Sequence, residues 1–352
     1  MSVLDKAEVS QFLLNEYHNM PQGKYVNIIL IRKTESETIF RTEGSGERLS
    51  REYVAAGQVD VQKIYRSVIT KRKQTAVERR TGRADSRQAS VPGTEECALN
   101  TNKPCGKCID CWLYGYAVGK SEAGAERIGT QKSRVITEDA FSILSANQVI
   151  GTRTFTGTFE DGTMRNPETK EPSRSIQIDE EYIKPETHYL DIETLKDVTP
   201  DEVRYVLGNI LRSTRYGAIS SKTGRIKNTI AGVIFSDVEI FSTLELIQKV
   251  HDILTGKVTN DELSEGREQK AEDKKKDAAK TEAEAELQFP LDDAAVSEAI
   301  NKATAILLKK VIGRNPVALS REEINTLEQE VQTLYQQPED FLKQVAAAYP
   351  KP

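Results

Sequence analysis

The sequence predicts an α+β fold, because segments typical of strands alternate with segments typical of amphipathic helices. Four segments are rich in β-branched and apolar residues and end at turn-forming or charged residues, as strands do. They span residues 25–31, 132–136, 188–195 and 230–241. Residues 59–80 and 199–211 instead place apolar side chains at the i, i+3, i+4 spacing of one helix face. The resulting order, strand, helix, strand, strand, helix, strand, is that of an RRM-like (ferredoxin-like) core.

The composition is that of an ordinary soluble chain of 352 residues, with 38% hydrophobic and 29% charged side chains. This length suits one large domain or two smaller ones. No run approaches the roughly 20 apolar residues of a membrane-spanning helix. Residues 1–20 carry charges where a secretory signal would be apolar. We therefore expect a cytoplasmic protein.

The first predicted helix, residues 59–80, is strongly basic. Its apolar face consists of Val61, Ile64, Tyr65, Val68 and Ile69. Its off-face cations are Lys63, Arg66, Lys71, Arg72 and Lys73. Between residues 61 and 90, nine basic residues meet only two acidic ones, so little compensates their repulsion. Charged runs are usually solvated faces, but this run predicts contact with phosphates.

All four cysteines lie close together, after a polar segment, residues 81–96, that is predicted to be a loop. They are Cys97, Cys105, Cys108 and Cys111, whose spacing lets four thiolates converge on one tetrahedral ion. We expect a structural zinc site with no open coordination position. The alternatives are disulfides, which a chain without a secretory signal disfavours, and four unrelated buried thiols.

Residues 152–178 predict a long β-hairpin, or arm. Residues 152–159 alternate as a strand does, turn-forming sequences follow, and the extended pattern resumes at residues 175–178. The cations of this segment are Arg153, Arg165, Lys170 and Arg174. The alternative is an ordinary surface hairpin.

The second predicted helix has a defined start and a basic end. Thr199 and Glu202 form a capping box, and Pro200 occupies the first turn. The helix runs into R-S-T-R-Y-G-A-I-S-S-K-T-G-R-I-K, which combines glycines, hydroxyls and cations, as phosphate-binding loops do. The segment contains neither a Walker loop nor a dinucleotide-binding fingerprint. We expect it to bind phosphates.

The chain is expected to divide into three regions. They are a core of residues 1–255 with insertions at about residues 81–115 (zinc) and 152–178 (arm), a charged linker of residues 256–286 and a helical tail of residues 287–352. In the linker 17 of 31 residues are charged, which indicates a solvated helix or a disordered segment. The tail shows an amphipathic pattern over residues 296–311, and a capping box of Ser320 and Glu323 opens a further helix. We expect the tail to pack on the core or on a neighbouring subunit.

Three motifs resemble the RAMP superfamily of CRISPR proteins. The cysteines run directly into W-L-Y-G, where the superfamily has Leu-Phe-Gly. The segment S-R-V-I-T-E-D-A-F, which contains Arg134, resembles its Ser-Arg-aliphatic-aliphatic-x-Asp-Ala segment. Tyr216, Gly217 and Gly224 lie in a loop similar to its Gly-rich loop, although doubled glycines are reduced to single ones here.

Together these motifs resemble the backbone subunit of a type I Cascade, and the cysteine-rich insertion is most similar to the subtype D form. The resemblance implies several copies polymerising along one CRISPR RNA, beside other Cascade subunits. It implies that guide bases stay exposed for pairing with a target DNA strand, and that the arm is a thumb wedged between them. No catalytic residue is predicted. The predicted RNA-binding residues are Lys63, Arg66, Lys71, Arg72, Lys73, Arg134, Arg153, Arg165, Arg174, Arg212, Arg215, Tyr216, Gly217, Lys222, Gly224, Arg225 and Lys227.

Two other functions stay open. Relatives in type III complexes cut target RNA with an aspartate in the loop after the first strand, and Asp60 lies in that region. No nearby carboxylate or histidine could share a metal with it, so an acid interacting with a helix dipole is the stronger interpretation. The other possibility is a single-strand RNA-binding zinc protein unrelated to CRISPR. Base stacking on the sheet is not predicted, because the aromatic RNP run of RRM proteins is absent.

Overall fold

The protein is built on one large antiparallel sheet. The computed structural model describes residues 2–40, 49–95, 97–98, 104–117, 129–155, 159–163, 165–171, 178–217, 224–257 and 287–350. The main path of the sheet is β11 (Arg215–Tyr216), β12 (Gly224–Ser236), β1 (Tyr25–Thr34), β10 (His188–Lys196), β7 (Ala140–Ser145), β3 (Lys63–Ile69) and β2 (Arg51–Ala55). Off this path, β6 (Val135–Thr137) pairs with β10, and β13 (Val317–Ala318) pairs with β12. The expectation of an α+β fold is confirmed.

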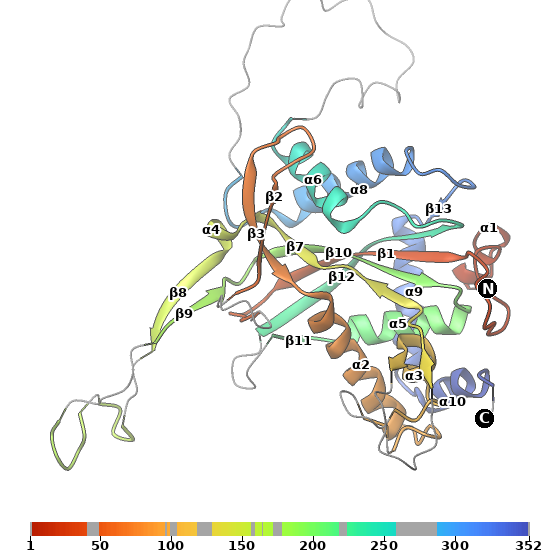
Figure 1. Ribbon diagram of the computed structural model, residues 1–352, viewed down its shortest axis with the longest axis horizontal. Coiled ribbons are helices and arrows are strands. Elements are labelled where there is room, and N and C mark those ends of the chain that lie inside the picture. The colour runs from red at the N-terminus through yellow and green to blue at the C-terminus, as the bar shows by residue number, and fades with distance from the viewer. Residues whose placement is uncertain are drawn as a thin grey trace, which may run out of the picture.

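Two short strand pairs stand apart from this sheet. β8 (Ile150–Phe155) and β9 (Ile178–Ile183) form a ribbon that projects from the body, as Figure 1 shows. β4 (Tyr116–Ala117) and β5 (Thr130–Gln131) form a smaller one near the cysteines. The ribbon lies where the sequence predicts the arm.

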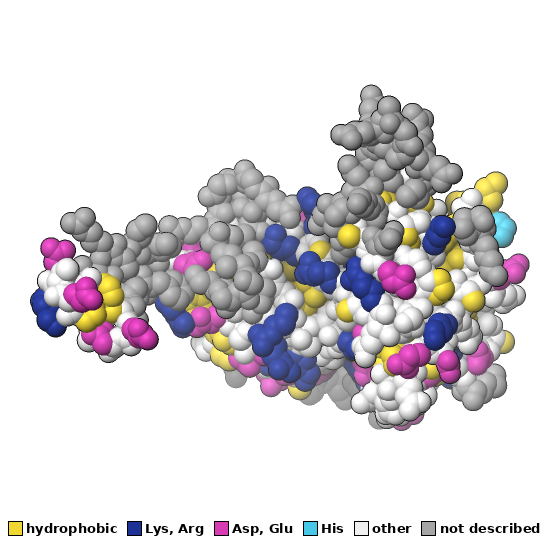
Figure 2. All heavy atoms as spheres, turned by 90° about the horizontal axis from the view of Figure 1, so that it is seen from below, with side chains coloured by type: hydrophobic (Ala, Val, Ile, Leu, Met, Phe, Trp, Pro, Cys, Tyr) yellow, Lys and Arg dark blue, Asp and Glu magenta, His cyan; other side chains and the backbone are white. Residues whose placement is uncertain are grey.

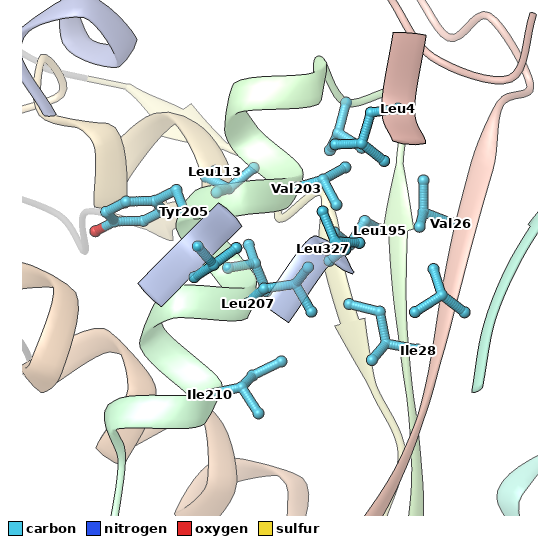
Figure 3. Packing of buried hydrophobic residues seen from close by; sticks show 14 of the residues in the cluster. Leu4, Val26, Ile28, Leu113, Leu195, Val203, Tyr205, Leu207, Ile210 and Leu327 are labelled. Carbon is cyan, nitrogen blue, oxygen red and sulfur yellow. The ribbon is translucent and has the colours of Figure 1, made fainter. Parts of the chain in front are cut away.

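Helices cover both faces of the sheet. In the described part of the chain the helices are α1 (Ala7–Ser10), α2 (Lys71–Gln88), α3 (Ile109–Tyr114), α4 (Ala146–Val149), α5 (Pro200–Arg212), α6 (Thr243–Leu254), α8 (Asp293–Leu308), α9 (Arg321–Leu334) and α10 (Glu339–Ala347), with a 3₁₀ turn at Val3–Asp5. On β1, Val26 and Ile28 pack toward α5 and α9 (Figure 3), whereas Ile29 and Ile31 belong to the core with α6 and α8. Because β1 is buried on both sides, its sequence is a continuous apolar run.

The helical tail packs on the same body. Residues of α8 join the core beneath α6, and residues of α9 and α10 join the core beneath α5. The Ser320 and Glu323 capping box at the start of α9 is present, as is the Thr199 and Glu202 box at the start of α5. The expected packing of the tail on the core is therefore confirmed, while the domain boundaries stay predictions. Most of the predicted linker, residues 258–286, lies outside the described part of the chain.

The prediction for residues 59–96 was wrong in its elements. Residues 63–69 form strand β3, and the basic helix begins only at Lys71 and continues to Gln88, into the predicted loop. Val61 and Tyr65, which were placed on a buried helix face, are exposed. Val68 and Ile69 are buried because the end of β3 lies inside the sheet. Strands β2 and β7 and helix α6 were not predicted.

The described residues contain no helix with the length and apolar character needed to cross a lipid bilayer.

Candidate metal centre and nucleic-acid interface

The four cysteines converge on one point. The Sγ atom of Cys97 lies 3.5 Å from that of Cys111 and 3.8 Å from that of Cys108, and the Sγ atoms of Cys105 and Cys111 are 3.9 Å apart. Four thiolates bound at about 2.3 Å to one tetrahedral zinc ion lie about 3.8 Å from each other. The backbone N–H groups of Lys107 and Cys108 point at the Cys105 sulfur, as they do around metal-bound thiolates. The four cysteines can therefore hold a metal ion.

The cysteine cluster is tied to α2 and to the core through α3. The Asp110 carboxylate accepts hydrogen bonds from Arg79 and Arg83 of α2. The shorter contact with Arg79 is 2.7 Å, and the contact with Arg83 is 2.5 Å. Leu113 enters the core, and the Trp112 ring stacks on Tyr349 near the C-terminus at 5.6 Å. These arginines were counted in the basic run of residues 61–90, but they hold α3 in place.

Several predicted RNA-binding cations are exposed. Lys63, Lys71, Arg72, Arg153, Arg165, Arg212, Arg215, Arg225 and Lys227 lie on the surface, and Lys73 is half-buried. Figure 2 shows Lys and Arg side chains grouped on the side of the molecule that carries α2 in Figure 1. Among them, Arg212 pairs with Asp85, Arg153 with Glu37, and Arg225 with Glu35 at 2.8 Å. Arg174 and Lys222 lie outside the described residues.

Arg66 and Arg134 are buried, contrary to their prediction as RNA contacts. The Arg66 guanidinium donates to the backbone carbonyls of Ala56 and Ser142 at 2.6 Å and 2.7 Å. Burial lowers the pKa of Arg66 to about 10, so it stays charged at neutral pH. Arg134 donates to Glu202 and to the Asp197 carbonyl, each at 2.9 Å. Both side chains fix elements of the fold and present no charge to a ligand.

The glycine-loop motif is also used inside the protein. The Tyr216 hydroxyl lies in the interior, where it contacts Arg32 at 3.0 Å and Asn228 at 2.9 Å. A Cβ at Gly224 would lie 1.5 Å from the Thr38 hydroxyl, and Gly217 has φ +111. Gly217 and Gly224 therefore let the chain pass close to itself. The sequence had instead predicted that these glycines bring the backbone close to phosphates.

Asp60 lies in the turn between β2 and β3. Its carboxylate is bonded to Lys257 at 3.1 Å and lies 3.5 Å from His251. Burial acts to raise the pKa of Asp60, but the hydrogen bonds from Lys257 and the Gln62 N–H, together with the charges of Lys257 and His251, outweigh it and the pKa is lowered. Within the described residues, the cysteines form the one group of three or more potential ligands that could share an ion. The structure therefore shows Asp60 in an ion pair; the expectations that no histidine lies near it and that it sits at the start of a helix were wrong.

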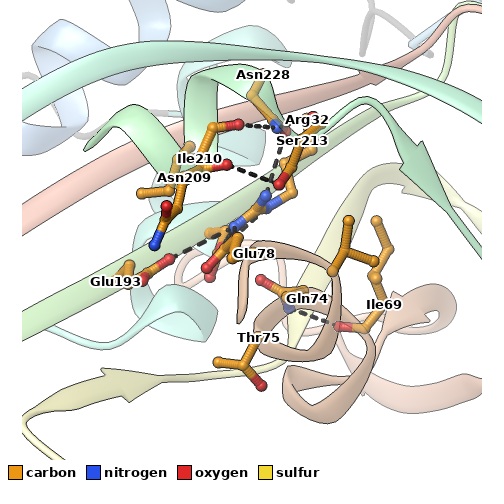
Figure 4. A network of polar contacts seen from close by, with 12 residues as sticks. Arg32, Ile69, Gln74, Thr75, Glu78, Glu193, Asn209, Ile210, Ser213 and Asn228 are labelled. Atoms are coloured by element: carbon orange, nitrogen blue, oxygen red, sulfur yellow. Dashed lines mark hydrogen bonds and ion pairs between the residues drawn. The ribbon is translucent and has the colours of Figure 1, made fainter. Parts of the chain in front are cut away.

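A buried cluster of charges was missed by sequence reasoning. Arg32 donates to Asp191 at 2.7 Å and to Glu78 at 3.0 Å, and lies 3.7 Å from Glu193, with all four side chains fully buried (Figure 4). Burial would lower the pKa of Arg32, but Tyr216 and the three carboxyls raise it well above its usual value. Burial raises the pKa of Glu78, Asp191 and Glu193.

The family is shown by comparison with known proteins. The sequence profile of the Csc2 CRISPR family matches residues 12–345, so the chain belongs to that family. No curated protein sequence matches it. The fold is similar to the crystal structure of Csc2 from Thermofilum pendens, with a TM-score of 0.53 at 15% identity over 96% of this chain and 93% of that chain.

Two chains from CRISPR assemblies are less similar. A chain of a CRISPR RNA-guided surveillance complex has a TM-score of 0.45 at 10% identity, over 92% of this chain and 100% of its own. A chain of a type IV-B CRISPR complex has a TM-score of 0.39 at 12% identity, over 58% of this chain and 90% of its own. The family match confirms the resemblance drawn from the three motifs. The chain is a CRISPR RNA-binding backbone subunit of a type I effector complex.

Proposed function

We propose that the subunit holds the phosphate backbone of CRISPR RNA on a basic surface that joins two elements. One element is the start of α2, with Lys71 and Arg72. The other is the sheet edge at β11 and β12, with the exposed Arg215, Arg225 and Lys227. Arg32, which bonds both Tyr216 of β11 and Glu78 of α2, holds the two elements against each other. We call these five cations the basic surface.

Binding to this surface is independent of RNA sequence. Lysine and arginine recognise phosphates, and each phosphate contact releases counterions, so affinity falls as salt rises. Contacts to the backbone leave the bases available, as pairing of a guide with a target DNA strand requires. We infer that several copies of the chain share one guide with other Cascade subunits, in the cytoplasm, and that the complex is of the subtype D form.

We propose that the centre of the sheet is an RRM-like unit. Strands β12, β1, β10 and β6 are neighbours in that order, and all pairs are antiparallel. Helix α2 lies between β1 and β6 in the chain, and α5 lies between β10 and β12, which is the ferredoxin-like arrangement. The face opposite these helices is covered by α6 and α8. RNA therefore meets the edge of the unit and its helices.

We propose that the cysteine cluster holds zinc. Four thiolates, with no fifth ligand among the described residues, suit a closed structural site, and the observed Sγ separations fit a tetrahedral ion. Bound zinc would fix the segment around Cys97 and Cys105 to α3. The cysteines position α3 against α2, on the side of the protein that carries the basic surface.

We propose that the subunit binds nucleic acid without cutting it. Asp60 was the residue on which a nuclease function depended. Its carboxylate is paired with Lys257, and the carboxylate of Asp252 accepts the backbone N–H groups of Gln58 and Val59 at 2.8 Å and 2.9 Å. These contacts support a role of both acids in holding the β2–β3 turn against α6.

The basic surface is tested by replacing Arg215, Arg225 and Lys227 together with alanine. We expect weaker binding to every RNA sequence and a shallower dependence of log Kd on log salt, by roughly 0.7 for each lost phosphate contact on a single strand. A triple alanine variant of Lys302, Lys309 and Lys310, at the end of α8, is the control for net charge. Fluorescence anisotropy at several salt concentrations measures the affinity and the salt dependence of each variant. An unchanged slope in the first variant, or an equal loss in the second, would contradict the proposal.

A further inference from the structure

The β2–β3 hairpin, which has no role in the function proposed so far, carries most of the exposed large hydrophobic side chains among the described residues. Four of the six belong to it: Tyr53, Val59, Val61 and Tyr65. Tyr53 and Tyr65 are direct cross-strand partners whose ring centroids lie 4.8 Å apart. They are 59% and 51% exposed. Exposed apolar groups gathered in one place mark an interaction surface.

Cations flank the two rings on the same face of the hairpin. Side chains alternate between the faces of a strand, so Arg51 and Lys63 project on the side of Tyr53 and Tyr65. Lys63 is exposed, and Arg51 is bonded to Glu181 of β9. Glu52, the one acidic residue of β2 and β3, projects from the opposite face. The rings are thus bordered by the exposed Lys63 toward the turn of the hairpin and by the Arg51–Glu181 ion pair in the other direction.

The ring pair lies on the side of the sheet that carries α2. Ser67, two residues after Tyr65, bonds the Tyr189 hydroxyl at 2.8 Å, and Tyr189 shares a core cluster with Val77 of α2. Strand β3 leads directly into α2, where the basic surface begins. A strand of RNA on Lys71 and Arg72 can therefore reach the tyrosines without crossing the sheet.

The hairpin is held rigidly, so the rings are positioned in advance. The Asp252 carboxylate of α6 accepts the backbone N–H groups of Gln58, Val59 and Asp60 at 2.8 Å, 2.9 Å and 3.2 Å. A Cβ at Gly57 would lie 1.8 Å from that carboxylate, so the turn sits directly on it. A rigid aromatic surface loses little entropy when it binds a flat partner.

We propose that Tyr53 and Tyr65 form a stacking platform for an unpaired base of the RNA whose backbone lies on the basic surface. The proposal rests on the proposed function and extends it from phosphates to bases. Aromatic rings stack on any base, so the platform is tolerant of sequence. Lys63 beside the rings, and Lys71 and Arg72 at the start of α2, suit the phosphates that flank a stacked base. This charge pattern favours RNA over an apolar protein segment.

The test compares RNA with a chain that lacks bases. Tyr53→Ala with Tyr65→Ala should weaken binding of a single-stranded RNA about tenfold, because a base stacked on an aromatic ring contributes roughly 1–3 kcal/mol. The same variant should bind an abasic ribose-phosphate chain of equal length as the unaltered protein does. Tyr53→Phe with Tyr65→Phe should retain affinity, since phenylalanine also stacks. Val59→Ser with Val61→Ser, in the turn of the same hairpin, is the matched control.

Each outcome decides between explanations. Equal affinity of the double alanine variant for RNA, or an equal loss on the abasic chain, would overturn the platform while the basic surface stands. Failure of the unaltered protein to bind RNA would overturn the proposed function and the platform with it. Self-association without RNA that the alanine variant abolishes, seen by sedimentation, would assign the rings to contact between copies and overturn the proposal.

Discussion

The buried carboxyls around Arg32 set a condition on the protonation of the folded protein. Three acids share one guanidinium, and oxygens of Glu78, Asp191 and Glu193 lack hydrogen-bond partners. A buried carboxylate without a partner is costly, so protonation is the less costly state. Burial, and then the neighbouring Glu78 carboxyl, raise the pKa of Glu193 well above its usual value of 4.5. The folded protein therefore retains a proton that the unfolded chain loses.

The sign of the pH effect follows from this raised pKa. The stability that the proton contributes is fully present at pH values below the pKa of Glu193 in the unfolded chain. It is lost as the pH rises through the pKa of Glu193 in the folded protein. In Glu193→Gln the amide is neutral at every pH. From about pH 5 to about pH 8 the unaltered protein should lose stability relative to this variant, by at most about 1.4 kcal/mol for each pH unit. Thermal unfolding across the range measures it.

A carboxyl on the surface provides the control for this prediction. Glu52 is exposed on β2, so Glu52→Gln should leave the shape of the pH curve unchanged. If the curves of Glu193→Gln and of the unaltered protein run parallel, the Glu193 carboxyl is not the group that holds the proton.

Among the elements, those with a local signal were predictable from sequence. The capping boxes of α5 and α9 and the continuous apolar run of β1 each use side chains within one segment. The boundary between β3 and α2 at Thr70 has no such signal. The residues of β3 that enter the sheet are buried on both sides and show no alternation, and by chance they match helical spacing. The ion pairs of Arg32 and Arg134 join distant segments, so sequence could not show that these cations are internal.

The cysteine cluster should stabilise α3 and what α3 touches. Removal of the metal by a chelator should lower the thermal unfolding temperature by about 5 °C, because the docking of Leu113 and Asp110 then loses its support. Elemental analysis should find one zinc per chain in the untreated protein. Cys111→Ser should lack the metal and unfold at the lower temperature with or without chelator. A protein without stoichiometric metal, or a chelator effect that persists in Cys111→Ser, would contradict this prediction.

At the scale of the whole molecule, the projecting β8–β9 ribbon is separable from the body. Its base is anchored, since Ile183 pairs with Thr38 and belongs to a core cluster. Beyond the ribbon, described residues such as Asp161 and Glu168 are exposed. Replacing residues 162–174 with a short Gly-Ser turn removes little buried apolar area and should leave the unfolding temperature within a few degrees, because buried area provides most of the stability.

The same replacement should have a large effect on assembly. If the arm is a thumb that spans the guide and reaches the next subunit, its loss removes a contact that repeats along the RNA. Light scattering with RNAs of increasing length should show mass rising in regular steps for the unaltered protein and no steps for the replaced one. Unfolding of the replaced protein would show that the arm belongs to the core. Regular steps without the arm would instead show that the contact between copies lies elsewhere, because a surface that repeats along a filament must be present in every copy.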